Sequence, residues 1–311
     1  MSAEPRIWFI GGGGFAASCL TRMSGSLAFE KILTGFPSKA GRGLAERVSR
    51  VEEAARKLGL PVERTGPLSR NEGIAEALSA APPDIVFVVD FAQLIREPLL
   101  SAPRHGCLNI HPSLLPRWRG AAPVQRALLS GDAVTGVTVF RLAEELDAGP
   151  ILRQREIPVP LTMTSTELFD ILASAGSQIA LEGVKSIVEG NCQFSNQNSE
   201  FVTYADKVSK AETRVSWDWS HLQIHNAVRA FASSTGAFTF FGGKRLKLWR
   251  TVPVGAGGIP GRVVCFIEGD PVVACAEGAL RLLEVQAEGK RRTGGADWAC
   301  GCRLEAGSVM M

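Results

Sequence analysis

The stretch DIVFVV, residues 84–89, decides the fold class of this chain. Five consecutive apolar residues follow Asp84, without the polar alternation of a strand that has one solvated face. Such a run is typical of a parallel strand that is buried on both faces. Further apolar runs lie at residues 6–10, 28–34, 107–110 and 136–142, and helix-like segments lie at 15–23, 46–58, 72–78 and 121–130. This alternation predicts an α/β domain, with a doubly wound, mostly parallel sheet and helices on both faces.

The second half of the chain has a different organisation. Residues 164–189 read as one long helix that begins with a capping box at Thr164 and Glu167. The polar, uncharged segment GNCQFSNQNS, residues 190–199, is a candidate linker. A helix follows at 221–231, with short β-type runs at 237–241, 245–251, 261–267, 271–275 and 279–285. We therefore predict a first domain over 1–189, a linker over 190–205 and a small OB-like β-barrel domain over 206–311.

Composition excludes several classes of protein. The chain has 311 residues, 45% of them hydrophobic, and a net charge of +3, which rules out a disordered or collagen-like chain. Its seven cysteines are scattered without a C-x-x-C pair, so we expect neither a disulfide framework nor a metal site, and a cytoplasmic location. No run reaches the roughly 18 apolar residues of a membrane span and no secretory leader is evident, so no membrane partner is expected.

The charges are unevenly distributed. Residues 1–204 carry 20 Lys and Arg against 21 Asp and Glu, whereas residues 205–311 carry 14 against 10. A basic C-terminal third is compatible with a polyanionic partner, although an excess of this size is also common in proteins without one.

A run of four glycines, Gly11–Gly14, follows the first predicted strand. It matches the dinucleotide pattern G-x-G-x-x-A at Gly11, Gly13 and Ala16, but a glycine run satisfies many patterns, and Glu30 is not cleanly at the end of the second strand. A dinucleotide-dependent oxidoreductase is therefore one alternative. The other reading is a strand-to-helix turn in which glycine permits close approach of a neighbouring segment.

Residues 107–149 carry the chemically informative side chains. Asn109 and His111 are two positions apart at the end of a predicted strand, so they face the same side of the sheet edge at which α/β proteins bind ligands. Asp147 follows the next strand. Ser113 lies in a proline-flanked loop without a nucleophile elbow, which argues against a covalent hydrolase. An amide, an imidazole and a carboxylate can together promote acyl transfer between bound substrates, although each alone is more often structural.

The sequence of this region resembles the sequences of a known family. Asn109-x-His111-x-Ser113-Leu114-Leu115-Pro116-x-x-Arg119-Gly120, followed by Thr135-Gly136-Val137-Thr138 and Asp147-x-Gly149, is similar to the formyltetrahydrofolate-dependent formyltransferases. The segments at 40–43, 205–210, 243–249 and 278–282 extend the resemblance over nearly the whole chain, and are most similar to the members that act on methionyl-tRNA.

The resemblance implies a complete set of roles. Asn109, His111 and Asp147 would be catalytic. The donor, 10-formyltetrahydrofolate, would be bound by Ser113, Leu114, Leu115 and Pro116, with its pterin near residues 87–95 and 142–147. The acceptor would be methionyl initiator tRNA, held by Arg42 and by a basic strand that includes Lys244, Arg245 and Lys247. No metal is implied, and we expect a monomer.

Three segments depart from the family pattern, one of them the stretch Ala232-Ser233-Ser234-Thr235-Gly236-Ala237, where the family usually carries a proline. The first turn usually reads G-[ST]-P-x-F-[AS] but here contains Gly12-Gly13-Gly14, and Val89 is followed by Asp90-Phe91-Ala92 where a small or aromatic residue and glycine are usual. Two further alternatives remain: a formyltransferase that acts on a small amine, such as a nucleotide sugar or a ribotide, and a nucleic-acid-binding module with a vestigial α/β domain. The basic C-terminal part argues against the first, and the intact Asn109, His111 and Asp147 argue against the second.

Overall fold

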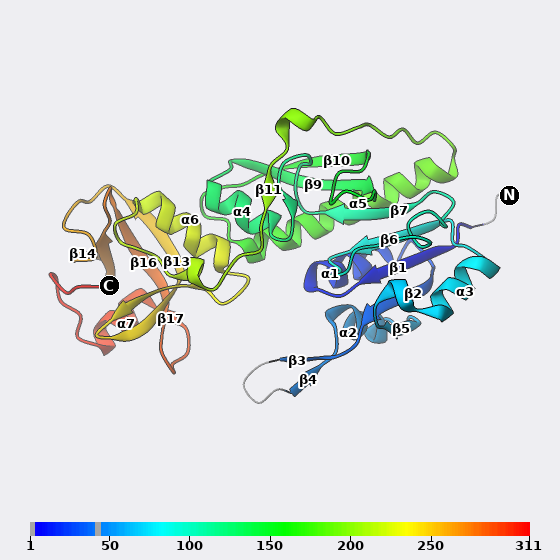
Figure 1. The fold of residues 1–311 in the computed structure, drawn as a ribbon. Helices are drawn as coiled ribbons and strands as arrows, with labels where there is room; N and C mark the ends of the chain where they lie inside the picture. The colour runs from blue at the N-terminus through cyan, green and yellow to red at the C-terminus, as the bar shows by residue number, and fades with distance from the viewer. Residues whose placement is uncertain (1–3, 41–44) are drawn as a thin grey trace. The chain divides into compact units, whose positions relative to one another are not determined.

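The computed structural model describes residues 4–40 and 45–311. A seven-stranded sheet forms the centre of the N-terminal part (Figure 1), in the order β10-β9-β7-β6-β1-β2-β5. Its strands are β1 (Ile7–Gly11), β2 (Phe29–Gly35), β5 (Val62–Thr65), β6 (Ile85–Val89), β7 (Cys107–His111), β9 (Val134–Arg141) and β10 (Ile151–Pro158). Neighbouring strands from β5 to β7 are parallel, and β9 and β10 are antiparallel. The prediction of a mostly parallel sheet is therefore confirmed, although β10 was not expected.

The strand order creates a ligand-binding edge. From β1 the chain moves outward through β2 and β5, and then returns to the other side of β1 with β6 and β7. Crevices of α/β proteins form at the carboxyl ends of the strands where the order reverses in this way. Because Val88 of β6 is in register with Asn109 of β7, the ends of these two strands lie level at this edge.

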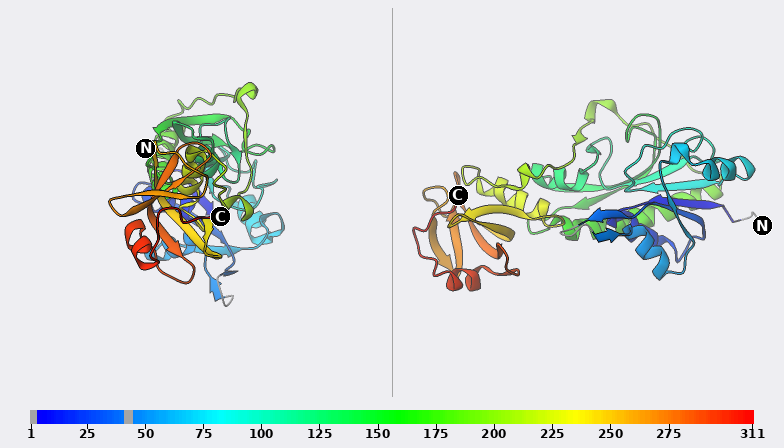
Figure 2. Two further views of the ribbon diagram at one scale, coloured as in Figure 1. Left: turned by 90° about the vertical axis from the view of Figure 1, so that its left-hand side faces the viewer. Right: turned by 60° about the horizontal axis from the view of Figure 1, so that its bottom comes forward.

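Helices cover both faces of the sheet (Figure 2), as predicted. On one face lie α1 (Gly14–Met23), α2 (Arg50–Lys57) and α5 (Ser165–Val188), and on the other lies α3 (Glu72–Ala80). The ring of Phe15 in α1 packs 6.2 Å from that of Phe169 in α5. A β-carbon at Gly176 would come within 2.6 Å of Ile110, so glycine lets α5 approach β7 closely.

Local signals explain where the helices begin. The predicted capping box of α5 is present, since the Thr164 N–H donates to the Glu167 carboxylate at 2.8 Å and its hydroxyl accepts from the Glu167 N–H at 3.5 Å. Ser220 and Gln223 form a second capping box at the start of α6 (His221–Phe231). Pro123 begins α4 (Pro123–Ser130), which ends at the left-handed Gly131.

The C-terminal sheet has the order β12-β13-β16-β15-β14, with β17 paired to β16. Its elements are β12 (Ala237–Phe241), β13 (Lys244–Val254), β14 (Val263–Ile267), β15 (Asp270–Ala274), β16 (Ala279–Ala287), β17 (Thr293–Gly294) and α7 (Gly295–Gly301). The segment 308–311 joins its two edges: Met310 pairs with Phe241 of β12, and Val309 pairs with Arg262 just before β14. This closure gives the predicted small barrel and leaves neither edge strand unpaired at these positions.

Short elements complete the fold. They are β3 (Ser38–Ala40) and β4 (Ala45–Arg47), which pair with each other, β8 (Arg119–Gly120) and β11 (Tyr204–Ala205), which also pair, and 3-10 helices at Leu68–Arg70, Ser199–Phe201 and Ala211–Thr213. Arg42, expected to contact tRNA, lies outside the described residues.

The chain divides into two compact units. The N-terminal unit comprises Met1–Gly120, Val134–Pro158 and Phe169–Tyr204, and the C-terminal unit comprises Ala121–Ala133, Val159–Leu168 and Ala205–Met311. Helix α4 thus groups with the barrel, and most of the segment expected to be a linker groups with the N-terminal unit. The predicted boundaries at 189 and 206 stay a prediction about independent folding.

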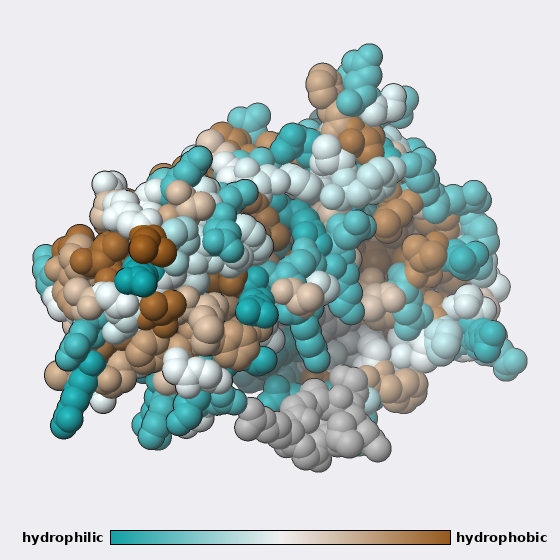
Figure 3. Space-filling view, turned by 60° about the vertical axis from the view of Figure 1, so that its left-hand side comes forward, coloured by the Kyte–Doolittle hydropathy of each residue, from teal (hydrophilic) through white to brown (hydrophobic). Residues whose placement is uncertain are grey.

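Hydrophilic and hydrophobic side chains are interspersed on the face shown in Figure 3. Within residues 4–40 and 45–311, no helix combines the length and the apolar character that crossing a bilayer requires. All seven cysteines are free thiols. Burial raises the pKa of the Cys107 thiol to about 12, and the thiol donates to the Leu99 carbonyl, so it packs rather than reacts.

Candidate active site

Strand β7 delivers Asn109 and His111 to the carboxyl edge of the sheet. Asn109 is in register with Phe140 and His111 with Thr138 of β9. His111 is 5% exposed, and its ring meets the Phe140 ring edge-on, with centroids 6.4 Å apart. The Asn109 side chain is half-buried, and no residue in the described part of the chain hydrogen-bonds its carboxamide. Its amide group is therefore available to a ligand.

Asp147 meets His111 from the loop after β9. Its Oδ2 atom lies 3.7 Å from Nδ1 of His111 and accepts the Gly120 N–H at 2.8 Å. Asp147 is 7% exposed and has a left-handed backbone, with φ of 51°. The structure thus places Asp147 against His111, which is two positions from Asn109 on the same strand and so faces the same side of the sheet.

The contact of the other ring nitrogen of His111 determines which tautomer the neutral ring adopts. Nε2 lies 2.9 Å from the carbonyl oxygen of Trp118. A carbonyl oxygen can only accept, so Nε2 carries a proton in this arrangement, and Nδ1 faces the carboxylate. A second proton on Nδ1 would place an imidazolium beside Asp147, in a site largely closed to water.

Hydrogen bonds to its main-chain carbonyls and from the Ser113 hydroxyl stabilise the loop from Ser113 to Pro116. The Ser113 hydroxyl donates to the Arg117 carbonyl at 2.7 Å, and Thr138 donates to the Ser113 carbonyl at 2.7 Å. The amide of Gln154 donates to the Leu115 carbonyl at 2.7 Å. Ser113 and Leu115 are buried, whereas Leu114 and Pro116 are partly exposed. Their role toward the donor stays a prediction, in which Ser113 and Leu115 shape the loop and Leu114 and Pro116 can touch a ligand.

Gly149 has a structural reason to be glycine. A β-carbon there would collide with the carbonyl oxygen of Arg141. The close approach holds the ends of β9 and β10 together around Asp147, so the Asp147-x-Gly149 spacing follows from packing.

Two residues that support the site received no role in the sequence analysis, namely Arg119, which was quoted only within the family motif, and Gln197. Arg119 is 6% exposed, pairs with Glu145 at 2.9 Å, and donates from Nε and Nη2 to the side-chain oxygen of Gln197 at 3.1 and 2.9 Å. Gln197 lies in the segment read as a linker, and the amide-rich composition around it gave no signal that singled it out.

The glycine run Gly11–Gly14 forms a strand-to-helix turn between β1 and α1, which is the alternative to a dinucleotide-binding loop. The N–H groups of Gly12 and Gly13 donate to the Asp90 carbonyl at 3.2 and 3.3 Å. A β-carbon at Gly11 would come within 2.8 Å of Ala16 and of the Val89 carbonyl. Two of the segments that depart from the family pattern, the glycine turn and the stretch that begins at Asp90, are therefore in contact with each other.

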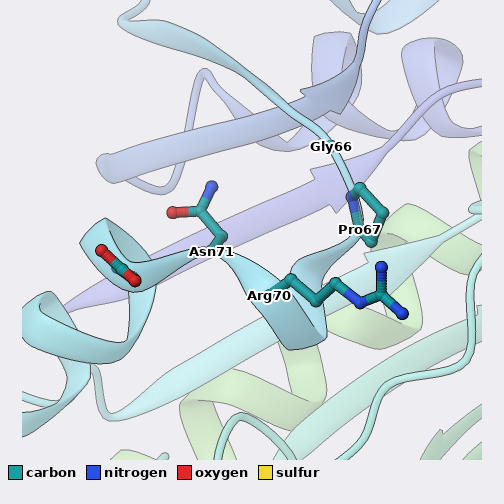
Figure 4. Close-up of a pocket in the computed structure, with 5 residues that line it drawn as sticks. Gly66, Pro67, Arg70 and Asn71 are labelled. Carbon is teal, nitrogen blue, oxygen red and sulfur yellow. The ribbon is translucent and has the colours of Figure 1, made fainter.

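Figure 4 shows a pocket that none of the predicted site residues lines. It is lined by Gly66, Pro67, Arg70, Asn71 and Glu72, between β5 and α3. Among residues 4–40 and 45–311, no cluster of three His, Cys, Asp or Glu side chains could hold a metal ion.

The three predicted tRNA residues other than Arg42 lie in the C-terminal unit. Lys244 and Arg245 are exposed and Lys247 is half-buried on β13. Arg245 and Lys247 are two positions apart on β13 and share one face. Arg245 lies 4.3 Å over the ring of Phe238, and Lys247 lies 5.4 Å over that of Trp249. A second basic cluster, Lys290-Arg291-Arg292, lies between β16 and β17. Arg292 lies 3.3 Å over Trp249, so both clusters contribute to one surface.

Comparison with known proteins defines the class. Residues 9–184 match the model of the formyl transferase family, and residues 207–303 match that of the formyl transferase C-terminal domain. The chain belongs to the formyltransferase family and is a formyl-transferring enzyme.

Two relatives of known name are similar to this chain over nearly its whole length. The chain is 38% identical over 303 residues to the methionyl-tRNA formyltransferase of Magnetococcus marinus, covering 97% of each chain. It is 36% identical over 308 residues to the methionyl-tRNA formyltransferase of Neisseria meningitidis serogroup B, covering 98% of this chain and all of the relative.

Solved structures share the fold. An N-formyltransferase from Helicobacter canadensis, in complex with folinic acid and dTDP-3-aminofucose, superposes with a TM-score of 0.66 at 15% identity, over 89% of this chain and 99% of that one. HypX from Aquifex aeolicus, in complex with tetrahydrofolic acid, gives 0.65 at 17%, over 98% of this chain and 48% of that one.

Proposed function

We propose that this enzyme transfers the formyl group of 10-formyltetrahydrofolate to the free α-amino group of methionyl initiator tRNA, and so supports translation initiation in the cytoplasm, acting as a monomer. One observation carries the chemistry. The half-buried Asn109 carboxamide has no partner among the described residues, whereas Nε2 of His111 faces the Trp118 carbonyl and Oδ2 of Asp147 faces His111 and accepts the Gly120 N–H.

The reaction is an acyl transfer without a covalent enzyme intermediate. The neutral amine attacks the formyl carbon, a carbon–nitrogen bond forms, and the carbonyl oxygen becomes an oxyanion. Asn109 donates to this oxygen, and a protonated His111 stabilises the same charge. The bond between the formyl carbon and N10 of the folate then breaks, the attacking nitrogen loses a proton, and N10 gains one.

Asp147 supports the charged form of His111. Its carboxylate lies 3.7 Å from Nδ1, and the Gly120 N–H holds it there. Electrostatic attraction is strong in a site closed to water, so this carboxylate would attract the positive charge that His111 carries while the oxyanion exists.

The barrel surface supports a nucleic-acid acceptor. Phe238 and Phe240 of β12 lie opposite Lys247 and Arg245 of β13, respectively, and Arg214 lies 5.3 Å over Phe240. Burial and then the charges of Arg245 and Arg292 lower the pKa of Lys247, so an anion would relieve repulsion here. Cations that bind phosphates, next to rings on which bases stack, are typical of RNA-binding surfaces.

The full sequence should be assayed with 10-formyltetrahydrofolate and three acceptors: methionyl initiator tRNA, methionyl elongator tRNA and a nucleotide-sugar amine. Mass spectrometry of the released amino acid or sugar detects one added formyl group. We expect formylation of the initiator species. Formylation of the sugar amine alone would overturn the proposed acceptor while leaving the chemistry intact.

A further inference from the structure

The segment before β11 does more than connect the two parts of the chain. Gln197, half-buried, lies against the loop that carries Asp147. Its side-chain amide donates to the carbonyl oxygens of Asp147 and Gly149 at 2.7 and 2.9 Å. Its side-chain oxygen accepts two hydrogen bonds from Arg119. Four hydrogen bonds therefore converge on one side chain next to the site.

The chemistry of the partners fixes how this amide is oriented. A guanidinium can only donate, so the oxygen of Gln197 must face Arg119. Main-chain carbonyls can only accept, so the NH2 group must face Asp147 and Gly149. A carboxylate at position 197 could satisfy Arg119 but not the carbonyls, and a methionine could satisfy neither.

These contacts involve both the segment that carries the Asp147 carboxylate and the segment that donates a hydrogen bond to it. Asp147 has φ of 51°, a conformation that a non-glycine residue adopts at some cost and keeps only when its surroundings hold it. The carbonyls bound by Gln197 belong to this residue and to Gly149. The N–H that Asp147 accepts belongs to Gly120, the residue after Arg119. Gln197 thus bridges the segment that bears the carboxylate and the segment that orients it.

We propose that Gln197 is a positioning residue, which fixes the Asp147 carboxylate against His111 by holding the main chain at 147–149 and the guanidinium of Arg119 together. This inference rests on the proposed function, since it assigns Gln197 a part in formyl transfer through Asp147. It also gives the predicted linker a second role.

Two substitutions separate the two halves of the contact. Gln197→Met has a similar length and no polar atoms, and Gln197→Glu keeps the acceptor for Arg119 but loses the donor for the carbonyls. We expect both to lower kcat by about 10- to 100-fold, because small displacements of catalytic groups have effects of this size, with KM for either substrate changed by less than about twofold. Gln193→Ala, at an exposed position of the same segment, is the matched control and should retain the parent kcat.

A double-mutant cycle tests whether the effect passes through Asp147. Asparagine tolerates the left-handed backbone, so Asp147→Asn removes the charge with little strain. In that background, Gln197→Met should lower kcat by less than about twofold, since linked residues are not additive. Thermal melting of each variant verifies that it is folded at the assay temperature.

The outcomes separate this inference from the proposed function. If the unsubstituted chain forms no formyl-methionyl-tRNA, the proposed function fails. If it is active but Gln197→Met leaves kcat unchanged, or lowers it equally with and without the Asp147 carboxylate, the positioning role is wrong. If Gln197→Glu retains the parent kcat while Gln197→Met lowers it, only the contact with Arg119 matters for turnover. That result also overturns the proposal.

Discussion

The carboxylate of Asp90 occupies the space in which a β-carbon at residue 13 would lie. Gly13 has φ of −83°, which any residue can adopt, so the requirement for glycine here comes from the neighbouring carboxylate and not from the backbone. Asp90 itself has φ of 46°, and burial raises the pKa of its carboxyl group against the opposing effect of the Phe15 and Ala16 N–H groups. The pair joins the turn after β1 to the end of β6.

We expect Gly13→Ala to destabilise the protein by about 1–3 kcal/mol, because it overpacks a closed site. Gly14→Ala is the matched control, since a β-carbon there meets nothing within 4 Å and should leave stability unchanged or raise it. Combining Gly13→Ala with Asp90→Gly should restore stability. Chemical denaturation of the four proteins measures this, and a Gly13→Ala variant as stable as its control would contradict the assigned contact.

The Asn109 carboxamide should matter for rate and little for stability. Removing one donor to an oxyanion typically lowers kcat by about 100- to 1000-fold, so Asn109→Ala should do so with nearly unchanged KM. Steady-state kinetics with saturating donor provides the measurement. Asn191→Ala, on an exposed position after α5, serves as the control. An Asn109→Ala variant within tenfold of the parent kcat would argue against oxyanion stabilisation by this side chain.

The sequence was sufficient to predict the elements whose signal is local. The apolar run of β6 and the cap at Thr164 each reflect a few adjacent residues, and the Asn109-x-His111 spacing fixes a common face by strand geometry alone. What it could not supply are contacts between distant segments. The pairing of Gly13 with Asp90, the bridge made by Gln197, and the alternating β10 on an antiparallel edge all depend on neighbours that only the folded chain brings together.

Acid should weaken one contact selectively. Hydrogen bonds from Arg126 and from the Ser209 N–H lower the pKa of Glu212 to about 2. A carboxyl group with a lowered folded-state pKa stabilises the protein above its unfolded-state value, near 4.5, and loses that contribution as pH falls toward about 2. The parent should therefore be more stable than Glu212→Gln at pH 7, with the difference vanishing in acid. Urea unfolding across this range tests it, with Glu200→Gln, at an exposed position, as control; a difference that persists at the acid limit would refute this assignment.

Charge reversal on the barrel should weaken tRNA binding in a salt-dependent manner. Each of Arg245→Glu and Lys247→Glu should reduce the slope of log affinity against log salt by about one if the side chain meets a phosphate. Filter binding at several salt concentrations provides the slopes. Lys185→Glu, on α5 and with a side chain 76% exposed, is the control. Slopes equal to the parent's in both barrel variants would mean that Arg245 and Lys247 pack on aromatic rings but do not contact phosphates of the tRNA.

Residues 308–311 close the barrel by pairing with the edge of β12 and with the chain entering β14. A preparation clipped in front of this segment would therefore present two open strand edges, which are templates for self-association. Such material would lose turnover through aggregation while every catalytic side chain remained intact. Intact mass should be verified before any loss of activity is assigned to a substituted residue.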